Sequence, residues 1–276
     1  YRTQITTMAR GSPSRRQFLA LVGASATAAT AGCASDSGDG SSSPAPGAGT
    51  ATDGRSDFAY PDGYSAEGVV DARAALESHA SFVTGRSNLT TSITRRRNSD
   101  GSGRVVTSST SRVDAERRRV YSEYVDEAHD KEFFFADGSL HLYSDQRNER
   151  VDPQAESLFA GDPPETFRAV ATYFWSALFP PLVDAFAFRA VETVTRLDQT
   201  AVRYTVTGTS SDSGTGWYNP NGELVVSSDG GVVRFAVAYS ESEAESPAEN
   251  GSRYELTVGD VGDTEVGTPP WFDSGS

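Results

Sequence analysis

Short runs of alternating apolar and polar residues, separated by turn residues, dominate the chain after residue 85. Such alternation is typical of half-buried strands, and the pairs Asp137-Gly138 and Asp229-Gly230 favour tight hairpins. The predicted strands are 89–93, 104–110, 120–125, 132–135, 140–143, 189–196, 201–207, the two arms of 222–239, and 253–258. With these strands and no strand–helix–strand repeat, the pattern predicts an α+β fold built on an antiparallel sheet.

Two segments interrupt this pattern with helical periodicity. Residues 66–82 carry apolar side chains at three-to-four spacing, and Ser65 is a candidate N-cap. A second helical block follows Asp162, and its residues 167–188 are almost entirely apolar or aromatic. Because proline lacks the backbone N–H, we expect Pro180-Pro181 to break this block into two short helices.

The N-terminal 33 residues have the features of an export signal. Arg15 and Arg16 precede an uncharged run of small and apolar residues, as in a twin-arginine signal. The run ends at Cys33, the only cysteine, in the lipobox-like sequence Thr30-Ala31-Gly32-Cys33. We therefore expect Arg15 and Arg16 to direct export and Cys33 to carry a lipid that anchors the protein to the membrane. The expected location is the cell surface, on the outer face of the cytoplasmic membrane.

The sequence divides into three regions. Residues 1–33 are the signal and lipobox, residues 34–57 a tether, and residues 58–273 an α+β domain. The tether contains only Ser, Gly, Pro, Ala, Thr, Asp and one Arg, so it cannot bury enough apolar surface to offset chain entropy, and we predict that it is disordered. We expect the protein to be a monomer.

The net charge of the chain limits the classes of partner that we expect it to bind. The chain has 24 Lys and Arg against 38 Asp and Glu, a net charge of −14, and Lys131 is its only lysine. So acidic a surface repels phosphate backbones, which argues against nucleic-acid binding. Self-repulsion fades at molar salt, where the Debye length is about 3 Å, and the depletion of lysine is typical of proteins from salt-loving archaea. A single cysteine also excludes an internal disulfide.

Several of these motifs together carry a family resemblance. They are the lipobox, the Ser/Gly tether, Tyr60-Pro61, Tyr64-Ser65 and Pro269-Pro270-Trp271. Together they resemble haloarchaeal lipoproteins exported by the twin-arginine route. The order of helix, strands, apolar helices and more strands is similar to the LolA and LprG class of lipoprotein and lipid carriers. That resemblance implies a curved half-barrel sheet, with helices on its concave face and an apolar cavity between them.

The 167–188 block supplies the candidate ligand-binding residues. Two short apolar helices against a half-closed sheet are able to line a pocket, because ligand cavities are mostly apolar. The candidates are Phe167, Val170, Tyr173, Phe174, Trp175, Leu178, Phe179 and Phe186. The alternative, which the sequence favours slightly, is that these side chains simply fill the core. A membrane span is disfavoured by Pro180-Pro181 and Asp184.

No motif for catalysis, metal or cofactor binding is recognisable. His79, His129 and His141 lack metal-site spacing and a nucleophile context, so we predict no metal, no cofactor and no assignable catalytic residue. A hydrolase that uses paired carboxylates stays open, because sequence alone cannot select them. Asn88 and Asn250 begin N-glycosylation acceptor patterns.

Two arginine triplets, 95–97 and 117–119, interrupt the acidic chain. They are interpreted mainly as solvated strand residues paired with acids, and alternatively as a cradle for an anionic headgroup.

The function expected from the whole pattern is a lipid-anchored surface protein that binds a hydrophobic ligand, a lipid or acyl chain. The alternative is an envelope interaction or structural module with no small-molecule ligand.

Overall fold

The computed structural model describes residues 58–86, 88–98, 103–127, 130–144, 149–151, 162–210 and 216–272. The predicted export signal at Arg15 and Arg16, the lipid site at Cys33 and the 34–57 tether lie outside these residues and stay predictions.

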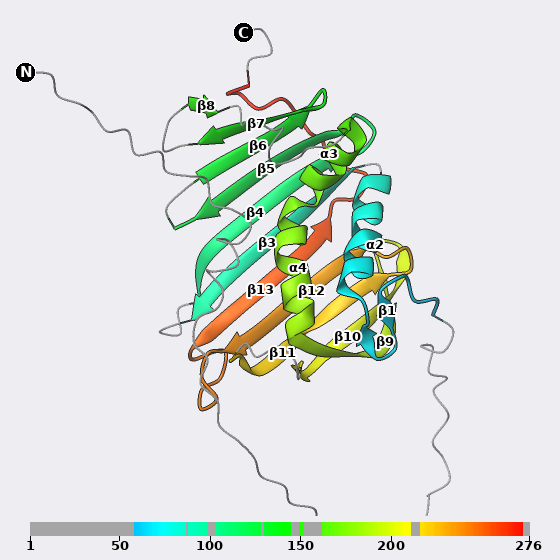
Figure 1. The fold of residues 1–276 in the computed structure, drawn as a ribbon, viewed down its shortest axis with the longest axis vertical. Coiled ribbons are helices and arrows are strands. Elements are labelled where there is room, and N and C mark those ends of the chain that lie inside the picture. The colour runs from blue at the N-terminus through cyan, green and yellow to red at the C-terminus, as the bar shows by residue number, and fades with distance from the viewer. Residues whose placement is uncertain are drawn as a thin grey trace, which may run out of the picture.

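Within these described residues, eleven antiparallel strands form one open sheet in the order β8-β7-β6-β5-β4-β3-β13-β12-β11-β10-β9 (Figure 1). Their bounds are β3 Asn88–Asn98, β4 Arg104–Asp114, β5 Arg119–Asp126, β6 Asp130–Ala136, β7 Ser139–Ser144, β8 Glu149–Val151, β9 Phe186–Arg196, β10 Gln199–Thr209, β11 Tyr218–Ser227, β12 Val232–Ser240 and β13 Gly251–Gly259. The predicted α+β class with a curved antiparallel sheet is confirmed.

The sheet consists of two meanders joined by one long-range pairing. Strands β3 to β8 follow one another along the chain, as do β9 to β13, and β13 then pairs with β3. In that pairing Tyr254 lies opposite Arg95, and Leu256 lies opposite Ile93. Residues about 160 positions apart therefore become neighbours, an arrangement that local turn signals do not encode.

In the part of the chain that the structure describes, the helices α2, α3 and α4 cover one face of the sheet (Figure 1). The first, α2, spans Ala72–Gly85, so the predicted helix over 66–82 starts six residues too early. Asp71, not Ser65, is its N-cap and accepts hydrogen bonds from the N–H groups of Arg73 and Ala74. The preceding residues form a short hairpin of β1 (Tyr64–Ser65) and β2 (Gly68–Val69).

Gly68 explains why the helix does not begin at the predicted residue 66. Its φ is +130°, and a Cβ there would lie 2.7 Å from the carbonyl oxygen of Phe188 on β9. A helix requires φ near −63°. The hairpin therefore sits directly against the edge strand β9, and Ala190 donates its N–H to Ala66 O at 3.0 Å.

The second helical block also differs from the prediction. It is divided at Thr172, between α3 (Pro163–Ala171) and α4 (Tyr173–Ala185), while Pro180 and Pro181 lie inside α4. Both prolines leave only the carbonyls of residues 176 and 177 without a helical N–H donor, and burial of α4 outweighs that loss. Asp162 caps α3 and accepts a hydrogen bond from the N–H of Glu165 at 2.9 Å.

The helix ends at Ala185, so residues 186–188 are strand and not helix. Phe186 pairs in register with Thr209 on β10 and stacks on Trp217 with ring centroids 5.5 Å apart. Strand pairing therefore overrides the helical pattern that the sequence shows there.

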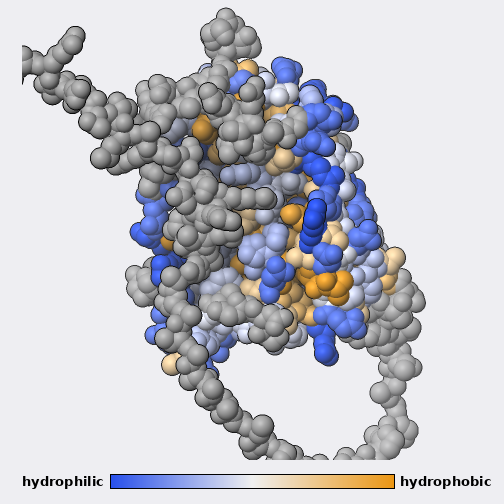
Figure 2. All heavy atoms as spheres, in the orientation of Figure 1, coloured by the Kyte–Doolittle hydropathy of each residue, from blue (hydrophilic) through white to orange (hydrophobic). Residues whose placement is uncertain are grey.

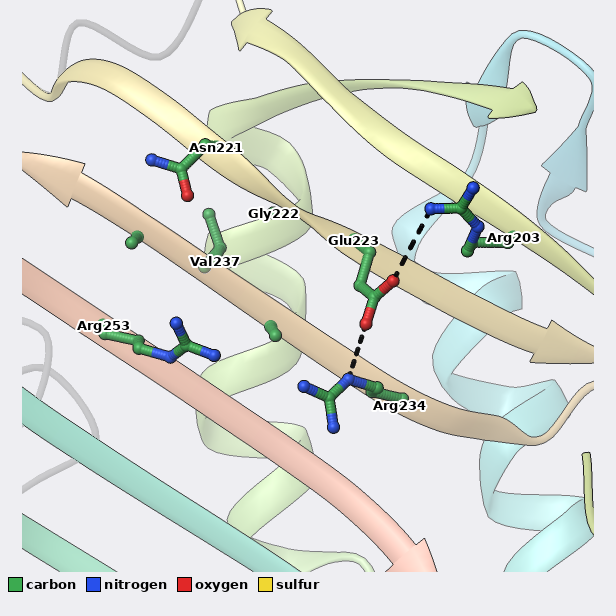
Figure 3. A pocket seen from close by; sticks show the side chains of 9 residues that line it. Arg203, Asn221, Gly222, Glu223, Arg234, Val237 and Arg253 are labelled. Atoms are coloured by element: carbon green, nitrogen blue, oxygen red, sulfur yellow. Dashed lines mark hydrogen bonds and ion pairs between the residues drawn. The ribbon is translucent and has the colours of Figure 1, made fainter.

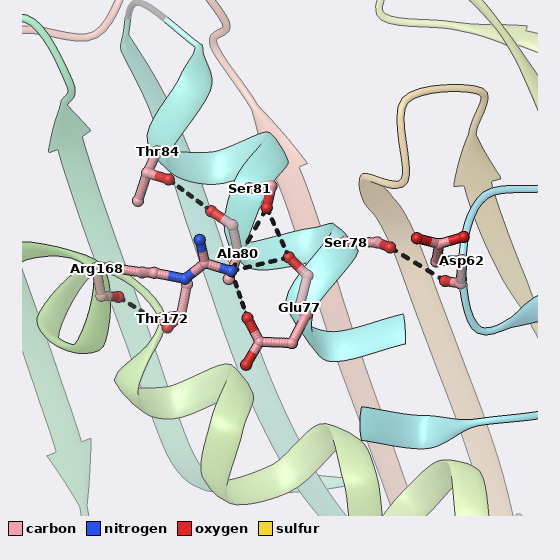
Figure 4. A network of polar contacts seen from close by, with 8 residues as sticks. All are labelled: Asp62, Glu77, Ser78, Ala80, Ser81, Thr84, Arg168 and Thr172. Atoms are coloured by element: carbon pink, nitrogen blue, oxygen red, sulfur yellow. Dashed lines mark hydrogen bonds and ion pairs between the residues drawn. The ribbon is translucent and has the colours of Figure 1, made fainter. Parts of the chain in front are cut away.

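Polar contacts join the helices to one another (Figure 4). The Arg168 guanidinium on α3 donates to the carboxylate of Glu77 on α2 at 2.6 Å and to the Glu77 carbonyl at 3.1 Å. It also donates to the hydroxyl of Ser81 at 3.4 Å. These bonds hold α3 against α2 above the apolar core. None of the helices in the described segments is both long enough and apolar enough to span a membrane.

The opposite face of the sheet is covered at one end by the C-terminal segment. Trp271 and Phe272 pack on the outward side chains of β5 to β7, where they enclose Phe134. The Trp271 indole N–H donates to Glu132, which also accepts from Tyr121 at 2.7 Å. The Pro269-Pro270-Trp271 motif thus closes a second small core.

Candidate functional site

Helix α4 is apolar on two adjacent sides. Trp175 and Phe179 are buried in the main core, together with Leu182 and Val183. Phe174 and Leu178, which immediately precede Trp175 and Phe179 in the sequence, are only partly buried. Successive residues of an α-helix project about 100° apart, so the second side of α4 faces away from the core centre. It faces a cavity.

The cavity has a volume of about 850 Å³ and lies between α4 and the helix-covered face of the sheet. Strands β13, β3, β4, β5 and β6 contribute its floor. Its lining residues are Ile93, Arg95, Arg97, Arg104, Val106, Thr107, Tyr124, Asp126, Glu127, Lys131, Phe133, Tyr173, Phe174, Ala177, Leu178 and Tyr254. On this side of the molecule, apolar residues gather over the middle and hydrophilic residues lie toward the edges (Figure 2).

Aromatic contacts hold one wall in place. The ring of Phe174 stacks on Tyr124 of β5 with centroids 5.6 Å apart and planes within 3°, and its edge meets Phe133 of β6 at 6.0 Å. Such contacts are specific in geometry and add to the burial of the rings. They fix the start of α4 against β5 and β6, while Ala177 and Leu178, farther along α4, also line the cavity.

Charged side chains line part of the cavity, and three of its four cations, all of them arginines, lie toward one end. Arg95 and Arg97 lie on the same face of β3 as Ile93, because alternate strand residues share a face. Arg104 of β4 pairs in register with Arg97, and Lys131 places its ammonium 5.9 Å from the centre of the Tyr124 ring. The cavity thus contains four cationic and two acidic residues in a chain of net charge −14.

The two acids are engaged with neighbours and do not converge on each other. Glu127 forms an ion pair with Arg104. Asp126 lies beside Tyr124, where burial and then the Asp126 charge raise the pKa of the tyrosine to about 12. Tyr124 is therefore a neutral phenol at physiological pH. A pair of carboxylates placed for hydrolysis is not formed by these two residues.

The predicted ligand-binding residues divide between the cavity and the core. Tyr173, Phe174 and Leu178 line the cavity. The other five are buried in the main core, which bears out the alternative interpretation for them: Phe167, Val170, Trp175, Phe179 and Phe186. Both interpretations of the 167–188 block therefore apply, each to a different side of the helices.

Most of the lining was not predicted as a site. Ile93, Phe133 and Tyr254 come from strands far apart in sequence, and no local motif connects them. A partial signal exists on β3, where apolar Leu89 and Ile93 share a face with Arg95 and Arg97. An arginine pair that continues the core face of a strand is unusual enough to mark a polar cavity.

The histidines do not form a site in the described part of the chain. His79 is fully buried under Trp175, with ring centroids 4.0 Å apart, and its Nδ1 accepts the N–H of Val232 at 3.2 Å. Burial lowers its pKa to about 3. His141 packs against Phe272 on the opposite face of the sheet, and His129 lies outside the described residues. No three His, Cys, Asp or Glu side chains gather as a metal site within the described segments.

The two glycosylation candidates lie in different settings. Asn88 opens strand β3 opposite Asp114, and its side-chain oxygen is buried. Asn250 precedes β13, and its amide nitrogen donates to Glu245 at 2.7 Å. Both glycosylation sites stay predictions.

A smaller hollow of about 260 Å³ lies on the face of the sheet that carries no helices (Figure 3). Charged side chains cross this face as a ladder of alternating sign. Its ion pairs are Arg203–Glu192 at 2.8 Å, Arg203–Glu223 at 3.9 Å, Arg234–Glu223 at 2.6 Å, Arg234–Glu255 at 2.9 Å and Arg253–Glu255 at 3.9 Å. Because the charges are mutually paired, this hollow offers a ligand little that is unsatisfied.

Comparison with known proteins shows no family for this chain. No protein-family model and no curated protein sequence matches the chain. Similar solved structures include LprF from Mycobacterium bovis, at 11% identity and a TM-score of 0.30, covering 72% of this chain and 96% of that one. A LolA superfamily protein from Nitrosomonas europaea is 9% identical with a TM-score of 0.25, covering 72% and 94%.

A DUF1329 family protein from Desulfovibrio piger is 10% identical with a TM-score of 0.24, covering 72% of this chain and 95% of that one. Likenesses at these TM-scores carry no argument about function, so the function is argued from the cavity alone.

Proposed function

We propose that the protein binds a hydrophobic ligand, a lipid or acyl chain, in the cavity beneath α4. The observation that carries this proposal is the cavity of about 850 Å³, with α4 on one side and five strands on the other. Ligand pockets typically measure about 300–1,000 Å³ and are lined mainly by apolar side chains. Ile93, Phe133, Phe174 and Leu178 give this cavity such a lining.

The cavity is supported by the packing around it. Trp175 and Phe179 anchor the other side of α4 in the core, and the stack of Phe174 on Tyr124 anchors its first turn. Collapse of α4 into the cavity would break both sets of contacts. An apolar ligand would remove the exposed lining from water at about 25 cal/mol per Å² of buried surface, which favours binding.

A probe-binding experiment tests this function. The full chain is titrated with N-phenyl-1-naphthylamine, an uncharged apolar fluorophore whose emission rises when it leaves water. Ala177→Trp places an indole inside the cavity, and we expect it to weaken probe binding at least tenfold. Ser176→Trp is the matched control, because Ser176 is the adjacent, exposed residue of the same helix and does not line the cavity.

The control separates cavity filling from general damage to α4. Binding by Ser176→Trp within about twofold of the unaltered protein, with the loss confined to Ala177→Trp, supports the proposal. If the unaltered protein binds no probe, or if both variants bind it equally well, the cavity is not a ligand site.

We further propose that the protein is exported and held at the outer face of the cytoplasmic membrane through lipid on Cys33. The sequence motifs around Arg15, Arg16 and Cys33 support this location. Intact-mass measurement of protein from its native host is the test. A chain that begins at Cys33 and carries added lipid mass is expected, and an unprocessed chain with an unmodified thiol would overturn the location.

A further inference from the structure

We infer that the cavity selects an anionic amphiphile, with the charged headgroup bound at Arg95 and the alkyl chain lying under α4. This inference deepens the proposed function and rests on it, because it names the class of ligand for the same cavity. The headgroup chemistry is a carboxylate or a phosphate, both of which a guanidinium binds through paired hydrogen bonds.

The polarity of β3 sets the orientation of such a ligand. Along the face that lines the cavity, the strand passes from the buried Ile93 to the partly exposed Arg95 and the exposed Arg97. Four residues of antiparallel strand span about 13–14 Å. The apolar part of this strand face therefore lies at the Ile93 end, and the three arginines of the cavity lie toward the Arg97 end, where Glu127 pairs with Arg104. Lys131 lies in the same row of the sheet as Ile93, three strands away.

Arg95 differs from the two arginines beside it in the cavity. Arg97 pairs with Glu241 at 3.2 Å, and Arg104 pairs with Glu127. Among the described residues, no carboxylate pairs with Arg95, and its buried Nε has no hydrogen-bond partner. Its guanidinium carbon lies 5.4 Å from the centre of the Tyr254 ring, which leaves the charge uncompensated by an anion.

The buried Nε of Arg95 carries a cost, because burial removes water from this donor without supplying an acceptor. An anionic headgroup would supply the counterion and the missing acceptor at once. A neutral amphiphile would also bury its alkyl chain, but it would leave the Arg95 charge without a counterion. The structure therefore predicts a preference for the anion over its neutral analogue.

Displacement of N-phenyl-1-naphthylamine measures this preference at fixed ionic strength. The competitors are dodecanoate, dodecyl phosphate and dodecan-1-ol, which share a twelve-carbon chain and differ in the headgroup. On the unaltered full chain we expect at least one of the two anions to displace the probe at a concentration at least tenfold lower than the alcohol. The more potent of the two anions identifies the headgroup.

Arg95→Met removes the charge and keeps an unbranched apolar side chain. We expect it to abolish the preference for the anion while the affinity for the alcohol changes by less than about threefold. Arg96→Met is the matched control, because Arg96 is the next residue of β3 and its side chain lies on the opposite face, beside Arg253. This control is expected to keep the preference.

Each result has a distinct meaning. Equal potency of both anions and the alcohol on the unaltered protein refutes the inference and leaves the proposed function standing. Failure of the protein to bind the probe, or of every competitor to displace it, refutes the proposed function as well. Equal loss of preference in Arg95→Met and Arg96→Met refutes a headgroup site at Arg95. The comparison on the unaltered protein decides the question even if Arg95→Met does not fold.

Discussion

His79 makes the folded state sensitive to acid. Its imidazole is fully buried between α2 and α4, and its Nδ1 accepts the N–H of Val232 on β12. Burial lowers its pKa from 6.5 to about 3. The native state therefore keeps this side chain neutral in a pH range where the unfolded chain takes up a proton.

The sign follows from proton linkage. Below pH 6.5 the unfolded state binds more protons than the folded state, so stability is lost as the pH falls from 6.5 toward 3. At 1.36 kcal/mol per pH unit, His79 contributes a loss of about 2 kcal/mol between pH 7 and pH 5. Other titrating groups add their own dependence, which cancels when the unaltered protein is compared with a His79 variant.

Two variants isolate this effect. His79→Phe keeps a ring against Trp175 but leaves the Val232 N–H without its acceptor, whereas His79→Asn keeps an acceptor and opens a small cavity. Both are less stable than the original at pH 7, by different amounts. Relative to either variant, however, the original should lose about 2 kcal/mol on going to pH 5.

Urea unfolding followed by tryptophan fluorescence at pH 5, 6 and 7, at one fixed salt concentration, measures these differences. The same pH-dependent difference against both variants would assign it to the imidazole. If the difference changes by less than about 0.5 kcal/mol between pH 7 and pH 5, His79 is not held neutral in the folded protein and the reasoning from burial fails.

Two further changes probe the face of the sheet opposite the cavity. Glu223→Gln removes the carboxylate between Arg203 and Arg234. Because these side chains are partly exposed, we expect denaturant titrations to show a loss of folding stability of less than about 1 kcal/mol that shrinks with added salt. A loss of stability that grows with salt would contradict a stabilising role for these ion pairs. Trp271→Ala opens the small core over β5 to β7, and we expect a loss of about 2 kcal/mol with unchanged fluorophore binding, since the cavity lies on the other face. Weaker fluorophore binding in this variant would show that the two faces are coupled.

Much of the fold was predictable because its signals are local. The hairpin turn at Asp137-Gly138 has positive φ at both residues, 52° and 79°, as the Asp-Gly pair indicates. The helix boundaries were less predictable. Ser65 is a good N-cap by type, but the contact of Gly68 with β9 requires an extended hairpin there, and a contact of that kind leaves no periodic pattern in the sequence.

The candidate site was predictable only in part. An apolar, aromatic helical block next to a sheet indicates either a core or a cavity, and the block alone does not say which residue faces which. The direction of α4 decides this, because its packing places Trp175 inward and Leu178 toward the cavity. That direction depends on contacts with α2 and β9, which come from two distant parts of the chain.

By itself, the sequence determined the antiparallel strands, the presence of two helical segments, the acidic surface and the alternation that puts Arg95 on the same face of its strand as Ile93. These properties depend on side-chain type and on near neighbours along the chain. Only the tertiary structure decided that β13 lies beside β3 and that a cavity lies between α4 and these two strands. It also decided that Arg95 has no carboxylate partner among the described residues. Those results depend on which distant surfaces pack together, and packing is a property of the whole fold.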